Sequence, residues 1–187
     1  MRSCVMTAED GTSLEVSKMP ASFRIRGPFE VPLGPNVNSK WIKDGCQEFW
    51  STSGAEGFAD RCGCYVFAMR ASKGFRPIYV GKAPKSFKQE CFASHKISCH
   101  YGPALLNSGK GAPVLFLVVL KHTKGKVNKS AIKKVESFLI QNAMKKNPDL
   151  SNIKGKKVEH WSIDGVIRSG KGKVSSPAKL FKRALGF

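Results

Sequence analysis

The pattern of apolar and polar positions is clearest in the middle of the chain, where an apolar segment runs from Ala112 to Leu120. It is too short for a membrane-spanning helix and rich in branched residues, so it predicts a buried central strand. Upstream, Gly63 to Met69 and Pro77 to Gly81 have strand composition, and the glycine-containing connection between them predicts a β-hairpin. Downstream, apolar residues at helical spacing predict an amphipathic helix from Ser130 to Lys145 that ends at Asn147-Pro148.

The N-terminal part has a weaker pattern. Alternating apolar residues predict two short strands between Phe23 and Leu33, interrupted at Gly27-Pro28. The stretch 41–58 is aromatic but has no period. It therefore indicates a loop-rich cover anchored by Trp41, Phe49, Trp50 and Phe58.

Three more elements are expected after the hairpin and at the end of the chain. Ser86 begins a predicted helix, one face of which carries Phe87, Cys91, Phe92, His95 and Cys99. A strand is expected over 158–163. A final short helix is predicted to be capped by Ser176 and to end at Gly186.

Together these elements predict a mixed α+β fold. Its centre is a small, largely antiparallel three-stranded sheet flanked by helices, with extensions at both ends. A chain of 187 residues has room for one such core. The expected division is a flexible arm over 1–22, a strand and loop extension over 23–61, the core over 62–155, and a basic C-terminal extension with a short helix over 156–187.

Charge is the unusual feature of the composition. Lys and Arg number 32 against 13 Asp and Glu, a formal net charge of +19, which predicts a polyanionic partner and nucleic acid in the first place. No apolar stretch approaches the ~20 residues of a spanning helix, and the first residues lack the apolar centre of a secretion signal. We therefore expect no membrane partner, a cytoplasmic protein that could associate with the nucleoid, and cysteines that remain free thiols.

Two triplets in the hairpin carry the chemistry. Gly63-Cys64-Tyr65 and Tyr79-Val80-Gly81 resemble the signature of the GIY-YIG nuclease family, from which each differs only in its middle residue. The resemblance covers roughly residues 62–155 and the order strand, strand, helix, strand, helix. It is strengthened by Glu136 on the later helix and by Asn152 in the turn that follows, because the family has a catalytic Glu and an Asn at these places.

The resemblance implies a metal-dependent hydrolysis of phosphodiester bonds. Tyr65 and Tyr79 would lie near the scissile phosphate, one of them helping to activate water. Glu136 would hold a single Mg²⁺ or Mn²⁺, as suits a site with few acidic groups. Lys82 is placed to meet a phosphate and is expected to lower a tyrosine pKa by its charge.

One departure from the family pattern concerns an arginine. The family presents an arginine on the helix after the second triplet, but no Arg occurs between Arg76 and Arg168. Lys88 could stand in as a point charge, without the bidentate geometry of Arg. His95, one to two turns further along, is the candidate histidine, and Glu90 would oppose phosphate binding.

Each of these residues also has a structural interpretation. A strand tyrosine is usually a packing residue, an isolated helix glutamate is usually solvated, and Asn152 could simply form a turn. Positions 91, 95 and 99 would share a helix face, which raises a zinc site formed by Cys91, His95, Cys99 and His100. Four ligands along one helix would, however, make poor tetrahedral geometry.

Other basic residues are candidates for contact with the nucleic-acid backbone. Lys outnumbers Arg by 24 to eight, which favours general phosphate attraction over specific base contacts. The candidates are Lys85, Lys88, Lys121, Lys124, Lys126, Lys129, Lys154, Lys156, Lys157, Lys179, Lys182 and Arg183.

Two functions follow as hypotheses. The first is a divalent-metal-dependent endonuclease of the GIY-YIG type acting on DNA, with RNA not excluded and with no small-molecule cofactor. Two copies acting together transiently would cut both strands. The second is a catalytically lapsed, non-catalytic nucleic-acid-binding protein on the same fold, which the missing arginine motivates.

Overall fold

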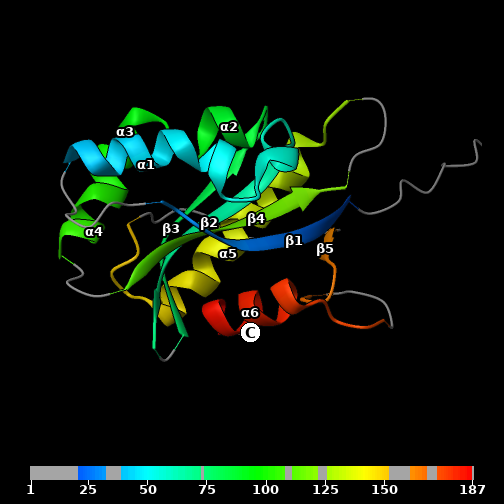
Figure 1. Ribbon diagram of the computed structural model, residues 1–187. Helices are drawn as coiled ribbons and strands as arrows, with labels where there is room; N and C mark the ends of the chain where they lie inside the picture. The colour runs from blue at the N-terminus through cyan, green and yellow to red at the C-terminus, as the bar shows by residue number, and fades with distance from the viewer. Residues whose placement is uncertain are drawn as a thin grey trace, which may run out of the picture.

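The computed structural model describes residues 21–32, 39–72, 74–107, 111–121, 126–151, 161–167 and 172–186. In these residues the chain forms an α+β protein whose five-stranded, mixed sheet is strongly curled into a half-barrel (Figure 1). The sheet order is β3-β2-β4-β1-β5, and every neighbouring pair is antiparallel except β1 and β5. The strands are β1 (Ala21–Glu30), β2 (Gly63–Ala71), β3 (Gly74–Ala83), β4 (Ala112–Leu120) and β5 (Trp161–Ile163).

The predicted α+β class is confirmed, but the three-stranded sheet is wrong. The expected strands β3, β2 and β4 lie side by side, and β1 adds to them by pairing with β4 from Phe23↔Leu120 to Glu30↔Val114. Residues 23–61 are therefore not a separate extension. β1 passes through Gly27-Pro28 with only a shift of register, and Gly27 has a φ of 94° where a Cβ would lie 2.7 Å from the Leu115 carbonyl oxygen.

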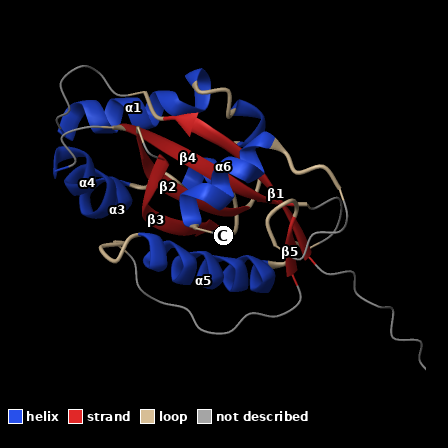
Figure 2. Cartoon of the chain, turned by 90° about the horizontal axis from the view of Figure 1, so that it is seen from below, coloured by secondary structure: helices blue, strands red, loops and turns tan. Residues whose placement is uncertain are grey.

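Helices cover both faces of the sheet (Figure 2). α5 (Lys129–Lys146) and α6 (Ser176–Leu185) pack on one face, against alternate β2 residues such as Cys64 and Val66. The other face buries Tyr65 and Phe67 beneath a second layer. That layer consists of α1 (Ser39–Thr52), the 3₁₀ turn η1 (Glu56–Phe58), α2 (Phe87–Glu90), α3 (Ser94–Lys96), the π-helical turn η2 (Ile97–Tyr101) and α4 (Gly102–Asn107).

Two helix predictions are wrong. The loop-rich cover expected over 41–58 is largely α1, because Ile42, Cys46 and Phe49 recur at helical spacing and are buried. The single helix expected after Ser86 is divided into α2, α3, η2 and α4. Ser86 does cap α2 by accepting a hydrogen bond from the Gln89 amide.

The later elements agree more closely with the sequence. α5 exceeds the predicted helix by one residue at each end and stops before Asn147, as expected. α6 ends at Gly186, whose φ of 71° suits glycine, but its cap is Ser175 rather than Ser176. Of the strand expected over 158–163, the described part is β5, because 152–160 lie outside the described residues. Within the described chain, no helix is both long and apolar enough to cross a bilayer.

Candidate active site

The candidate site lies along β3, the edge strand that carries both Tyr79 and Lys82. Successive strand residues point to opposite faces, so these two residues, three positions apart, face opposite layers. Tyr79 belongs with the core under η2, whereas Lys82 faces α5. Because β3 is at the edge of the described sheet, side chains from both layers can meet beside it.

Glu136 and Lys82 form the ion pair of the site. Lys82 Nζ donates to Glu136 Oε2 at 2.8 Å, and the glutamate side chain is only 15% exposed. Its helix starts at the Asn128 cap, whose side chain accepts from the Ala131 amide, and buries Val135. Glu136 therefore sits at the boundary between the packed face of α5 and solvent, where Lys82 compensates its charge.

Tyr65 is completely buried and lies over Gly81, its partner across the hairpin. A Cβ on Gly81 would stand 2.3 Å from the Tyr65 hydroxyl oxygen, and one on Gly63 would stand 2.1 Å from the Val118 carbonyl oxygen. Packing alone therefore explains why glycine occupies these positions in both triplets. Burial raises the pKa of Tyr65 well above its ordinary value, so this hydroxyl stays protonated.

Tyr79 is half-buried and stacks on His100, with ring centroids 4.4 Å apart and planes at 27°. Its centroid is 6.2 Å from that of Tyr65. Burial raises the pKa of Tyr79, and the carboxylates of Glu136 and Glu90 raise it further. The expectation that Lys82 lowers a tyrosine pKa is therefore wrong, because burial raises the pKa of both phenols and two carboxylates add to the rise at Tyr79 alone. Tyr79 can donate a hydrogen bond but is a poor base.

His100, not His95, is the histidine that contacts a signature tyrosine. The π-helical turn η2 carries it toward β3, whereas His95 on α3 is exposed. The pKa of His100 is lowered by its partial burial and by the nearby His95 and Lys96. Its imidazole is consequently neutral at pH 7 and able to accept a proton.

Lys96 is the second residue that sequence reasoning missed. It is 5% exposed, and its Nζ donates to the Glu90 carbonyl oxygen at 2.6 Å and to Glu90 Oε2 at 3.1 Å. The ammonium lies 5.3 Å from the Tyr65 ring centroid. Lys96 therefore supplies the cation near Tyr65, while Lys88, suggested as a stand-in for arginine, is exposed on α2. No local sequence pattern marks Lys96, because its burial depends on the carbonyl and carboxylate of Glu90.

The remaining predicted residues are dispersed. Asn152, Lys124, Lys154, Lys156 and Lys157 lie outside the described residues. Lys121 pairs with Asp164. Lys182 is half-buried on α6, and the exposed members of the set are Lys85, Lys88, Lys121, Lys126, Lys129, Lys179 and Arg183.

Glu136 is the candidate ligand for a metal ion at this site. Among the described residues, no group of three His, Cys, Asp or Glu side chains gathers with metal-binding geometry. The zinc alternative is therefore wrong: the helix is divided, Cys91 is buried with a raised pKa, and Cys99 is exposed. The donor set at Glu136 does fit Mg²⁺, which is often held by one carboxylate and several waters.

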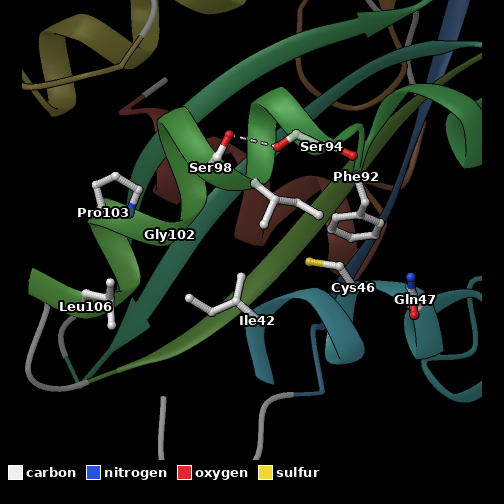
Figure 3. Close-up of a pocket in the computed structure, with 10 residues that line it drawn as sticks. Ile42, Cys46, Gln47, Phe92, Ser94, Ser98, Gly102, Pro103 and Leu106 are labelled. Carbon is white, nitrogen blue, oxygen red and sulfur yellow. Dashed lines mark hydrogen bonds between the residues drawn. The ribbon is translucent and has the colours of Figure 1, made fainter. Parts of the chain in front are cut away.

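An apolar cavity lies away from these residues. A groove of about 440 Å³ lies between α1 and the segment from Phe92 to Leu106, with Ile42 and Cys46 on one wall and Pro103 on the other (Figure 3). It is mainly apolar and contains none of the predicted catalytic residues. It borders the same turn that presents His100 to β3.

Comparisons with protein-family models, with curated proteins and with solved structures give no match to this chain.

Proposed function

We propose that this protein is a divalent-metal-dependent endonuclease of the GIY-YIG type that hydrolyses DNA phosphodiester bonds. The observation that supports the proposal is that the edge strand β3 carries two pairs, Lys82–Glu136 on one face and Tyr79–His100 on the other. The Glu136 carboxylate is close enough to Tyr79 to raise the pKa of its hydroxyl. These four residues come from α5, β3 and η2. Between them they provide a carboxylate, an ammonium, a protonated phenol and a neutral imidazole.

Each group has a role in hydrolysis. The Lys82 ammonium binds a non-bridging phosphate oxygen, and the Tyr79 hydroxyl donates a hydrogen bond to the phosphate or to the attacking water. His100 accepts the proton of that water through an imidazole nitrogen as the water oxygen bonds to phosphorus and the bond to the departing oxygen breaks. The buried side chains of Tyr65 and Lys96 pack beneath these groups and support their positions.

Glu136 is the residue that would hold the metal. When bound, the ion would supply charge neutralisation at the phosphate and at the departing oxygen. The ion pair engages Oε2 of the carboxylate, so metal binding is favoured when Lys82 turns to the phosphate. The partly exposed Lys82 side chain has room for this change, being 43% exposed.

The second candidate is a nucleic-acid-binding protein without catalysis. The ion pair itself favours it, because Lys82 already compensates the carboxylate that a metal would need. Such a protein would bind nucleic acid with a steep salt dependence and no requirement for magnesium.

Nicking of supercoiled plasmid separates the two candidates. Magnesium-dependent nicking that is lost in Glu136→Gln supports the endonuclease. Binding without nicking under any metal condition supports the non-catalytic protein.

A further inference from the structure

One end of the sheet gathers basic residues from segments far apart in the sequence. β2 begins there and β3 and β4 end there, since Gly63 pairs with both Ala83 and Val119. β1 also begins at this end, with Phe23 opposite Leu120. It is the end at which the β4 arrowhead, the start of β1 and β5 lie in Figure 1.

Contacts hold together the segments that carry these basic residues. The Lys88 amide donates to the Ala59 carbonyl and the Phe87 amide to the Arg61 carbonyl, each at 2.9 Å, so α2 is attached to the turn after η1. The Arg26 guanidinium lies 5.4 Å from the Phe58 ring centroid at the end of that same 3₁₀ turn. The exposed residues Lys88 and Arg61 thus lie on the same side of the molecule as Arg26 on β1.

Beyond Arg26 the surface hollows into a cleft of about 280 Å³. Arg24 and Arg26 line it from β1, and Lys173 lines it from the segment before α6. Asp164 is the carboxylate among its lining residues, and it is already held by the Ser22 hydroxyl at 3.1 Å, by Arg24 Nε at 3.7 Å and by Lys121. The charge that remains in the cleft is positive.

We infer that this basic rim, formed by Lys88, Arg61, Arg26, Arg24, Lys121 and Lys173, binds the sugar–phosphate backbone of nucleic acid. Arg24 and Arg26 point to the same side of β1 and are about 7 Å apart along the strand, a separation that suits adjacent phosphates. The exposed carboxylates of Glu56 and Asp60 in the η1 region lie near the rim. They reduce its positive electrostatic potential without cancelling it.

The inference rests on the proposed function, because the rim is a second surface that contacts the same nucleic-acid substrate. The cleft is on β1, whereas Tyr79 is on β3, three strand spacings or roughly 14 Å across the sheet. Residues of the cleft therefore do not reach the reacting phosphate. Their loss should weaken binding and leave the turnover of bound substrate unchanged.

A matched pair of double variants tests the rim. Arg24→Gln/Lys173→Gln removes two charges from the cleft. Lys145→Gln/Lys146→Gln removes two from the far end of α5, where Asn147 binds the Pro77 carbonyl near the hairpin. Binding of a labelled DNA duplex is measured in EDTA over a range of salt concentrations, with unfolding midpoints to show that both variants fold.

The cleft variant should bind about tenfold more weakly, with a salt slope reduced by about 2, and the control should stay within about twofold of the wild type. Equal losses in both variants, or no loss in the cleft variant, would overturn the rim. Because the assay needs no cleavage, this result is independent of the nuclease proposal.

Discussion

The His100 imidazole lies face to face with the Tyr79 phenol, with centroids 4.4 Å apart. The pKa of His100 is lowered first by burial and then by the neighbouring His95 and Lys96. We therefore expect the cleavage rate to be maintained above the ordinary histidine pKa of about 6.5 and to fall as pH drops through the lowered value. A pH–rate profile under saturating substrate measures this acid limb.

The same profile distinguishes the two histidines. His100→Gln should lose about 10²-fold or more in rate and should no longer show the acid limb, because the proton acceptor is gone. His95→Gln, at an exposed site, should keep the limb. An unchanged profile in His100→Gln would show that this histidine only packs against Tyr79.

The signature glycines should be required for stability before they matter for chemistry. Gly81→Ala pushes a methyl group into the buried Tyr65 side chain, and Gly63→Ala pushes one into the Val118 carbonyl. Each should lower the free energy of unfolding by about 1–3 kcal/mol or more. Gly57→Ala is the control, since a Cβ there meets no atom within 4 Å. Denaturant unfolding of the three variants gives the comparison, and equal stabilities would refute the close approach at the triplets.

Lys96 and Lys88 should differ sharply when replaced by Met. Removal of the buried Lys96 ammonium leaves the Glu90 carboxylate without its ion-pair partner and the Glu90 carbonyl with only the 3.4 Å hydrogen bond from the Tyr65 hydroxyl. This loss should cost about 2–3 kcal/mol of folding free energy. Lys88→Met changes an exposed side chain on the neighbouring helix and should stay within about 0.5 kcal/mol of the wild type. Chemical denaturation measures both, and similar small effects would mean that Lys96 is not an anchor of the site.

Cysteine labelling tests the two packed layers. Burial raises the pKa of Cys46 to about 12 and that of Cys64 and Cys91 well above the ordinary value, and the thiolate is the form that reacts. Exposed Cys99 should therefore be alkylated by iodoacetamide far faster than these three in native protein. Peptide mass spectrometry over time, with guanidinium-unfolded protein as the reference, provides the rates. Rapid labelling of Cys64 would contradict the packing of α5 on β2.

The strands and helices with strong periodicity could be predicted from the sequence. β4 is a continuous apolar segment, the hairpin strands are bounded by turn residues, and α5 has an apolar face, so each is set by local pattern. β1 was underestimated because its role depends on pairing with β4, about 90 residues away, which no local pattern reports. α1 was missed because its aromatic residues and Gly45 obscure the helical spacing of Ile42, Cys46 and Phe49.

The candidate site could be predicted only in part. Lys82 and Glu136 do form an ion pair, because hairpin register and α5 periodicity determine where they point, whereas Tyr79 faces the other layer of the sheet. His100 could not be chosen over His95, since a π-helical turn changes which side of the helix faces β3. Lys96 reads as a surface charge in the sequence, and its burial depends on the carbonyl and carboxylate of Glu90.

The most direct measurement of the central claim is nicking of supercoiled plasmid by the wild type and by Glu136→Gln, each with Mg²⁺ and with EDTA. The substitution keeps the size of the side chain and removes the charge that would hold the metal. We predict nicking by the wild type with Mg²⁺ only, a loss of about 10²-fold or more in the variant, and DNA binding that is retained in the variant. Nicking that persists in Glu136→Gln, or wild-type binding without any metal-dependent nicking, would contradict the assignment of this site as a nuclease centre.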